Sequence, residues 1–207
     1  MIGIIDYNAG NITSVERALK SLGIDFLLSK KTSELESCSK LIFPGVGDAA
    51  YAMTQLKESG FDKFIKEKTE AGTPLLGICL GSQIIFDWSE EGDTKCLGLV
   101  KGKIRYFDSI KPGLSKEGFK IPQIGWNNLT EKNGGSPILK GVKDNADFYF
   151  VHSYVICPED ASVIKASCDY GIEVPSVIQS GNIFACQFHP EKSGEEGLKI
   201  LKNFCNL

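Results

Sequence analysis

A short stretch, Gly77-Ile-Cys-Leu-Gly81, constrains this chain more than any other part of the sequence. It continues an apolar run, residues 73–78, that predicts a β-strand, and it leads into an amphipathic segment that reaches Trp88. Glycines on both sides of a thiol, between a strand and a helix, are typical of a nucleophile elbow. Such a turn lifts its side chain above the carboxyl end of the strand, and the helix N-terminus favours the thiolate. A buried structural cysteine is the alternative, and we favour the elbow because strand, turn and helix coincide at Cys79.

The first half of the chain alternates short apolar runs with helical spacing. The apolar runs predict strands at residues 1–6, 25–28, 40–43 and 73–78. Apolar residues at helical spacing predict helices at 11–22 and at 48–71, the second broken near Gly60. Strands that alternate with helices of this length form right-handed βαβ units around a parallel sheet that is covered on both faces.

The second half carries strand-like runs separated by turn residues. These runs lie at residues 103–107, 121–126, 148–156, 162–166, 176–179 and 183–188. A helical pattern from Ser193 to Asn206 ends the chain. We therefore predict an α/β fold in which hairpins extend a mainly parallel sheet. We treat residues 1–207 as one domain, because single domains commonly contain about 100–200 residues.

Composition argues against several classes of function. With 23 Lys and Arg against 26 Asp and Glu, the formal net charge is −3, so no overall basic field attracts nucleic acid. The 7 cysteines are scattered without Cys-x-x-Cys spacing, which argues against a disulfide framework and against a thiolate metal site. The first apolar run is too short for a signal peptide or a membrane span of about 20 residues, so we expect a cytosolic protein.

A thiol nucleophile needs a base, and the chain contains only 2 histidines. His189 is followed two positions later by Glu191, and in an extended segment such residues project to the same side. Glu191 can then hold one ring nitrogen of His189 while the other faces Cys79. A strand-end histidine beside a surface glutamate is the alternative at this point. His152 fits a structural role better than that of a base.

A glycine-rich loop, Phe43-Pro-Gly-Val-Gly-Asp48, follows the third expected strand. Its Gly-x-Gly-x-x-Ala spacing superficially resembles a dinucleotide-binding turn. That turn normally follows the first strand and is paired with an acidic residue that ends a strand about 20 positions later, and this chain has no such strand-ending acid. We interpret the loop instead as a second source of backbone N–H groups for an oxyanion beside Cys79.

Together these motifs resemble the class-I, triad-type glutamine amidotransferases. Within that class the chain looks like the glutaminase subunits of imidazole glycerol phosphate synthases along essentially its whole length. The motifs that carry the resemblance are Asp6-Tyr-x-x-Gly-Asn11, Pro44-Gly-Val-Gly47, Gly77-Ile-Cys-Leu-Gly-Ser-Gln83, Pro122-x-x-Gly-Trp-Asn127, Phe150-Val-His-Ser-Tyr154 and Gln187-Phe-His-Pro-Glu-Lys-Ser193. The resemblance implies a flavodoxin-like fold with a mixed, mainly parallel sheet and helices on both faces. It implies no metal and no organic cofactor.

The resemblance also implies a role for each matching residue. Cys79 would attack the side-chain amide of glutamine, His189 would shuttle protons, and Glu191 would orient His189. The resulting thioester would be hydrolysed to glutamate, and ammonia would leave. The remaining implied residues are the oxyanion donors Leu80, Val46 and Gly47, and the groups that hold glutamine, which are Gly45, Gly47, Gln83, Ser153 and Tyr154.

A partner follows from the same resemblance, a (β/α)8-barrel cyclase that forms a heterodimer with this chain. Ammonia would pass through the barrel to a phosphoribosyl-formimino nucleotide. The products would be imidazole glycerol phosphate and aminoimidazole carboxamide ribotide, in histidine biosynthesis. Residues 7–11, including Asn11, together with Trp126, Asn127 and Lys192, would lie on the docking face. A core position for Trp126 and a solvated charge for Lys192 are the alternatives.

One residue departs from the family pattern, and the acceptor of ammonia stays open. The family usually has Pro-His in the loop where this chain has Pro122-Gln123. Paralogues of the family supply ammonia to a sugar amidotransferase in surface-glycan biosynthesis, which is the alternative within the enzyme class. A non-catalytic regulatory module would have lost a triad residue, and this chain retains all three. An unpartnered thiol hydrolase is disfavoured by Gln83 and by Ser153-Tyr154.

Overall fold

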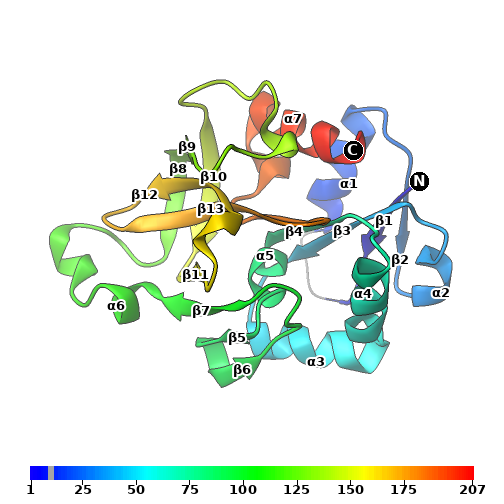
Figure 1. The fold of residues 1–207 in the computed structure, drawn as a ribbon, viewed down its shortest axis with the longest axis horizontal. Helices are drawn as coiled ribbons and strands as arrows, with labels where there is room; N and C mark the ends of the chain where they lie inside the picture. The colour runs from blue at the N-terminus through cyan, green and yellow to red at the C-terminus, as the bar shows by residue number, and fades with distance from the viewer. Residues whose placement is uncertain (9–11) are drawn as a thin grey trace.

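The computed structural model describes residues 1–8 and 12–207 (Figure 1). An eight-stranded sheet crosses it in the order β2-β1-β3-β4-β14-β13-β12-β9. Its parallel strands are β2 (Phe26–Ser29), β1 (Ile2–Ile5), β3 (Lys40–Gly45), β4 (Leu75–Cys79) and β14 (Ile183–Cys186). Its antiparallel extension consists of β13 (Glu173–Ser180), β12 (Ile164–Asp169) and β9 (Thr130–Glu131). The prediction of an α/β fold with a mixed, mainly parallel sheet is confirmed.

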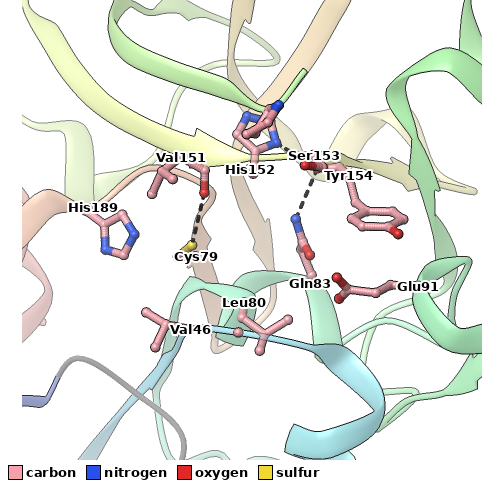
Figure 2. A pocket seen from close by; sticks show the side chains of 12 residues that line it. Val46, Cys79, Leu80, Gln83, Glu91, Val151, His152, Ser153, Tyr154 and His189 are labelled. Atoms are coloured by element: carbon pink, nitrogen blue, oxygen red, sulfur yellow. Dashed lines mark hydrogen bonds between the residues drawn. The ribbon is translucent and has the colours of Figure 1, made fainter. Parts of the chain in front are cut away.

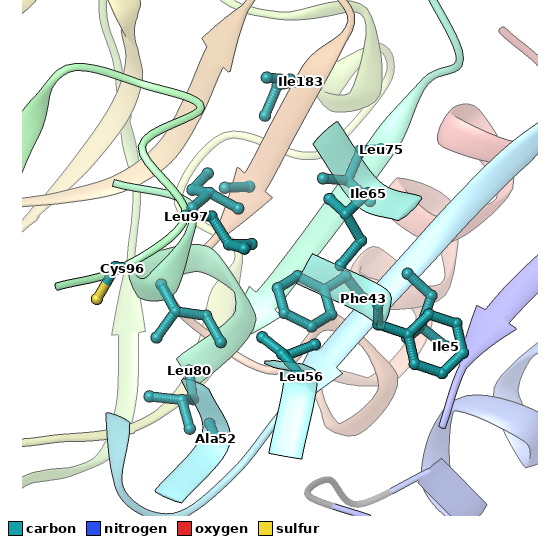
Figure 3. Packing of buried hydrophobic residues seen from close by; sticks show 14 of the residues in the cluster. Ile5, Phe43, Ala52, Leu56, Ile65, Leu75, Leu80, Cys96, Leu97 and Ile183 are labelled. Carbon is teal, nitrogen blue, oxygen red and sulfur yellow. The ribbon is translucent and has the colours of Figure 1, made fainter. Parts of the chain in front are cut away.

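Helices cover both faces of this sheet (Figure 1). The helices α1 (Ile12–Ser21) and α7 (Gly194–Cys205) pack on one face, and α3 (Ala49–Ser59) and α4 (Phe61–Glu70) pack on the other. Neighbouring strand residues point to opposite faces, so Leu75 joins the core under α3 and α4 while Leu76 joins the core under α1 and α7. Figure 3 shows the first of these cores, with Leu56 and Ile65 against Phe43.

Two smaller sheets stand beside the main one. The first pairs β8 (Gln123–Asn128) with β10 (Asp147–His152). The second has the order β11-β7-β5-β6, with β11 (Tyr154–Pro158), β7 (Gly102–Tyr106), β5 (Trp88–Ser89) and β6 (Thr94–Lys95). The short helices are α2 (Thr32–Leu35), α5 (Leu80–Ile84) and α6 (Phe107–Ile110). Single 3-10 turns lie at Glu91–Asp93, Leu114–Glu117, Pro137–Leu139, Ala161–Val163 and Pro190–Lys192.

Most predicted elements of the first half form where the periodicity places them. The predicted break near Gly60 is confirmed, because Gly60 has a φ of 76° and separates α3 from α4. The helix expected to continue to Trp88 is shorter than predicted, since α5 ends at Ile84. The backbone carbonyls of Ile84 and Ile85 accept hydrogen bonds from Leu97 and Leu99, so a distant loop takes the groups that a longer helix would use.

The single strand predicted at residues 148–156 is wrong. It divides at Ser153 into β10 and β11, which belong to different sheets. The Ser153 carbonyl accepts a hydrogen bond from the Phe107 N–H, and the His152 ring lies 2.7 Å from the Tyr154 carbonyl oxygen. These bonds draw the chain out of the β10 ladder and turn it toward the carboxyl ends of β3 and β4.

Candidate active site

Cys79 is the last residue of β4 and directly precedes α5. Its φ of 54° and ψ of −110° are rarely adopted by residues other than glycine, as expected for a strained nucleophile elbow. The turn is tightly enclosed. A Cβ at Gly81 would lie 2.0 Å from the Phe43 carbonyl oxygen, and one at Gly77 would lie 2.8 Å from the Gly81 carbonyl oxygen. The glycines on both sides of the thiol are therefore required for the elbow to close against β3.

The elbow opens into a cavity of about 280 Å³ (Figure 2). The structure brings most of the predicted site residues to this cavity, and those that line it are Val46, Gly47, Cys79, Leu80, Gln83, Ser153, Tyr154 and His189. Cys79 is 7% exposed, and its sulfur lies 3.8 Å from the Val151 carbonyl oxygen. The thiol is therefore sheltered, yet it borders a space large enough for a small substrate.

His189 and Glu191 form a buried pair on the wall beside Cys79. The distance between His189 Nδ1 and Glu191 Oε1 is 2.6 Å, and the two side chains are 2% and 1% exposed. The contact that sequence spacing predicts is present, but its geometric reason differs. Glu191 lies in the 3-10 turn Pro190–Lys192 and not in an extended segment, so the turn brings the carboxylate back to the ring.

The other ring nitrogen of His189 is directed toward the thiol (Figure 2). Among the described residues, Nε2 has no hydrogen-bond partner, although it is buried. Burial alone would lower the pKa of His189, but the neighbouring Cys79 and Glu191 outweigh it and raise that pKa to about 9. This imidazole therefore holds its proton at neutral pH, with a carboxylate on one side and a thiol on the other.

His152 faces the same cavity and has the opposite character. It is 6% exposed, and burial lowers its pKa to about 4, so the ring is neutral at pH 7. Its ring lies 2.9 Å from the side-chain oxygen of Gln123. Gln123 is the residue that departs from the family pattern. Gln123 is 2% exposed, because it is the first residue of β8 and points inward while Ile124, the next residue, points outward.

The glycine-rich loop at the end of β3 lies directly beside the elbow. Gly45 is opposite Cys79 in the parallel ladder, and Val46 and Gly47 border the cavity. Gly47 has a φ of 95°, a left-handed conformation that favours glycine. Gly45 itself lies behind the cavity, where an added Cβ would come within 2.8 Å of the Tyr7 hydroxyl. That hydroxyl is buried and has no hydrogen-bond partner among the described residues.

Three of the residues predicted to hold glutamine, Gln83, Ser153 and Tyr154, form the wall opposite His189 (Figure 2). The Gln83 amide donates hydrogen bonds to the Tyr154 carbonyl oxygen at 3.1 Å and to the side chain of Gln187 at 2.8 Å. The first of these contacts connects α5 with the turn between β10 and β11 (Figure 2), and the second connects α5 with the segment after β14. Ser153 and Tyr154 reach the cavity only because the chain turns there.

Sequence reasoning missed Glu91. It stands in the 3-10 turn after β5, faces the cavity, and accepts a hydrogen bond from the Ala49 N–H at 2.9 Å. Burial and the nearby Asp48 carboxylate raise the pKa of Glu91. No local signal distinguishes it, since it belongs to a run, Ser89-Glu-Glu-Gly-Asp93, that is typical of an exposed turn. Only the packing of that turn against α3 places its carboxylate in the cavity.

An exposed aromatic and aliphatic patch adjoins the His189 wall. Trp126 is 58% exposed, which rules out the core position considered for it, and Ile124 is 61% exposed. The Trp126 ring packs edge-on against Tyr149 with centroids 5.8 Å apart, and Lys192 lies 5.9 Å above the Tyr149 ring. Lys192 is therefore held over an aromatic ring and not free in solvent. The predicted docking residue Asn11 lies outside the described residues.

The described part of the chain contains no group of three or more His, Cys, Asp or Glu side chains placed to hold a metal ion. Within that same part, none of the helices is both long enough and apolar enough to cross a membrane.

Comparison with known proteins identifies relatives along the whole chain. Residues 3–207 match the family model described as glutamine amidotransferase class-I. A protein of Geobacillus kaustophilus, named imidazole glycerol phosphate synthase subunit HisH, is 49% identical over 210 residues, with 100% of this chain and 97% of the relative covered. A protein of the same name from Dehalococcoides mccartyi is 46% identical over 208 residues, with 100% and 97% covered.

Solved structures share the fold at lower sequence identity. A crystal structure of a glutamine amidotransferase superposes with a TM-score of 0.75 at 20% identity and covers 100% of this chain and 99% of its own. The structure of PurLQS from Thermotoga maritima superposes with a TM-score of 0.73 at 19% identity, with 99% and 97% covered. At this level of identity the likeness concerns the fold alone.

Proposed function

This chain belongs to the class-I glutamine amidotransferase family, and on that premise we propose that it is the glutaminase subunit of an imidazole glycerol phosphate synthase. In this proposal residues 1–207 act as a single amidotransferase domain. The chain hydrolyses glutamine to glutamate and passes the ammonia to a cyclase subunit. The reaction belongs in the cytoplasm, because a free nucleophilic thiol needs a reducing compartment.

The proposed chemistry starts with attack of the Cys79 sulfur on the side-chain amide carbon of glutamine. The thiol has already given its proton to His189 Nε2, so the sulfur attacks as a thiolate, a C–S bond forms, and the amide carbonyl becomes an oxyanion. His189 then donates that proton to the amide nitrogen, the C–N bond breaks, and ammonia leaves a thioester. Water attacks the thioester with His189 as base, which releases glutamate and restores the thiol. Glu191 keeps the proton on Nδ1, so that Nε2 exchanges protons with the substrate.

Backbone N–H groups beside the elbow supply the proposed oxyanion hole. The Leu80 N–H follows the nucleophile directly, which is the position that nucleophile elbows use. Val46 and Gly47 supply the second donor from the loop that borders the cavity. Gly45 contributes by letting that loop approach the elbow, since a side chain there would collide with the Gly81 N–H at 2.7 Å.

The cavity offers complementary groups for the amino-acid end of glutamine. The Glu91 carboxylate is the anion on the wall away from His189, and we assign it to the α-ammonium group of the substrate. Gln83, Ser153 and Tyr154 surround the same end and hold the α-carboxylate and α-ammonium groups by hydrogen bonds. A substrate held in this way directs its side-chain amide toward Cys79.

The exposed patch next to the His189 wall is the proposed docking surface for the cyclase. Trp126, Ile124 and Tyr149 present apolar and aromatic groups, and Lys192 adds a positive charge at the edge. Aromatic residues of this kind are common at the centre of protein interfaces. A (β/α)8-barrel cyclase docked here would cover the mouth of the cavity and receive ammonia without its release to water.

The observation that carries this proposal is the Cys79 elbow facing the buried His189–Glu191 pair across one cavity. Glutamate release from glutamine tests it, measured for the chain alone and with the cyclase of the same genome plus its nucleotide substrate. We expect strong stimulation by the loaded cyclase. No release in either condition would overturn the proposal. Activity only with a barrel paralogue encoded among surface-glycan enzymes would assign the chain to sugar amidation instead.

A nucleophile variant provides the matched control. Cys79→Ser is nearly isosteric, so it should fold normally and lose glutamine-dependent turnover. Synthesis from free ammonia by the assembled enzyme should survive, because the cyclase does not need the thiol. Loss of ammonia-dependent synthesis as well would show that Cys79 has a structural role.

A further inference from the structure

Gln123 and His152 form a buried cross-strand pair at the edge of the cavity. Gln123 is the first residue of β8, His152 is the last residue of β10, and the two are direct partners in the antiparallel ladder. Their exposed fractions are 2% and 6%. Side chains directly opposite each other in such a ladder contact one another, so the pairing register itself brings the amide to the imidazole.

The hydrogen-bond inventory of His152 defines what Gln123 must do. The Tyr154 carbonyl oxygen lies 2.7 Å from Nδ1, and a carbonyl can only accept, so Nδ1 carries a proton. The ring is neutral, because it is buried beside the rings of Phe107 and Phe150, at 5.2 and 5.8 Å, and no carboxylate of the described residues bonds to it. Nε2 is then an acceptor, and the Gln123 amide must donate to it.

The Gln123 amide can satisfy this requirement at the position it occupies, by a rotation of its terminal amide group. Its oxygen and nitrogen exchange places when the group rotates by half a turn, which directs the NH₂ to His152 and the oxygen to Cys168. The Cys168 sulfur carries an S–H donor, and it lies 3.8 Å from the amide atom of Gln123 that faces away from His152. Each of the three groups then has a partner, from Cys168 through Gln123 to His152.

This chain of hydrogen bonds ends at the substrate-facing turn. The Tyr154 carbonyl oxygen accepts from both His152 and Gln83, so one oxygen joins the buried pair to the cavity wall. The same turn carries the Val151 carbonyl, 3.8 Å from the Cys79 sulfur. Val151 and His152 end β10, whereas Tyr154 begins β11 of another sheet, so the β10 ladder does not fix Ser153 and Tyr154.

We propose that Gln123 and His152 are positioning residues that hold the turn at residues 151–154 in the shape that receives glutamine. This inference rests on the proposed function, because it names what that substrate site needs to stay formed. His152 does not act as a base, since both ring nitrogens are occupied by hydrogen bonds to protein groups. Its contribution is to glutamine affinity, and Gln123 contributes through it.

Glutamine affinity in the complex with the cyclase tests the proposal. Calorimetry on a Cys79→Ser background measures binding without turnover, and kinetics on the otherwise unmodified complex separates KM from kcat. Gln123→Leu keeps the volume but leaves His152 Nε2 without a donor. We expect the Kd and KM for glutamine to rise about tenfold, because one buried hydrogen bond is lost. We expect kcat to change less than about twofold.

A conservative variant and a distant control complete the experiment. Gln123→Glu accepts a hydrogen bond from a doubly protonated His152 and another from the Cys168 thiol, so it should restore Kd to within about threefold of the original. Thr69→Val removes a buried hydrogen bond inside α4, to Ile65, and should lower thermal stability while Kd stays unchanged. An unchanged Kd in Gln123→Leu, or failure of Gln123→Glu to restore it, would overturn the proposal. Absence of glutamate release by the unmodified complex would overturn the proposed function instead.

Discussion

The two histidines border one cavity and have opposite chemical characters. His189 directly precedes the 3-10 turn that follows β14, and a carboxylate lies 2.6 Å from one of its ring nitrogens. His152 stands at the end of β10, with a carbonyl at 2.7 Å and an amide at 2.9 Å. The first has its pKa raised to about 9, and the second has its pKa lowered to about 4. Burial is common to both, so it does not explain the difference.

The partners of each ring decide the outcome. A carboxylate stabilises a positive ring, whereas a carbonyl and an amide satisfy a neutral ring without compensating a charge. His189 also keeps one nitrogen free of protein partners among the described residues, and His152 keeps none. One histidine can therefore exchange protons with a substrate, and the other can only hold the backbone in place.

Replacement of each histidine by asparagine should break the comparison most clearly. In the complex with the cyclase we expect His189→Asn to lower kcat about 10³-fold, because it removes the proton shuttle. His152→Asn should raise KM and lower kcat less than about tenfold, since it disturbs only the position of the turn. Glutamate release at saturating glutamine measures both, with thermal unfolding as the control for folding. Equal losses of kcat in the two variants would contradict the separate roles of the two histidines.

Removal of the Glu191 carboxylate, which makes the pKa of His189 differ from that of His152, should have the next largest effect. Glu191→Gln keeps the shape but no longer favours a charged His189, so we expect kcat to fall about 100-fold and the pKa of His189 to fall with it. Glu195→Gln, on the exposed first turn of α7, is the matched control and should keep the original kcat. Full activity in Glu191→Gln would show that the carboxylate does not orient the imidazole.

The features of the site that the sequence predicted are those whose signals lie within a few neighbouring residues. The Cys79 elbow follows from a strand, two glycines and a helix within a dozen residues, and each of these signals depends only on neighbouring positions. The pairing of His189 with Glu191 was predicted from their separation of two residues. The contact formed, but through a 3-10 turn that the intervening proline begins, so the spacing was informative while the assumed backbone was wrong.

The parts that sequence could not predict depend on packing between distant segments. Glu91 and Cys79 are brought to one cavity by contacts between α3 and the turn after β5, and no pattern around Glu91 indicates this. The division of one predicted strand at Ser153 depends on the Phe107 N–H, far away in sequence. The inward direction of Gln123 follows from the register of β8 with β10, which only the folded chain defines.

A third test compares two carboxylates at the cavity. Glu191 serves a histidine, whereas Glu91 is assigned to the substrate, so their loss should affect different kinetic constants. We expect Glu91→Gln to raise KM for glutamine about tenfold, with kcat within about threefold, because an ion pair with the α-ammonium group is lost. Glu90→Gln is the neighbouring control, since Glu90 bonds Arg105 away from the cavity, and KM should stay unchanged. A fall in kcat alone would assign Glu91 to the chemistry.

The smallest effect is expected for a change of pH near neutrality, because neither histidine ring changes its charge there. Nitrogen-15 NMR should show the His189 ring losing its proton with a midpoint near 9, and the His152 ring gaining one only near 4. The two shifted pKa values have opposite effects on the free energy of unfolding. The raised pKa of His189 stabilises the fold below its unfolded value of 6.5, and this is lost as pH rises through 9. The lowered pKa of His152 destabilises the fold as pH falls from 6.5 through 4. His152→Asn should therefore flatten only the acid side of the stability profile. A flattened alkaline side in that variant would mean that the two rings share their protons, and that their separate roles are wrong.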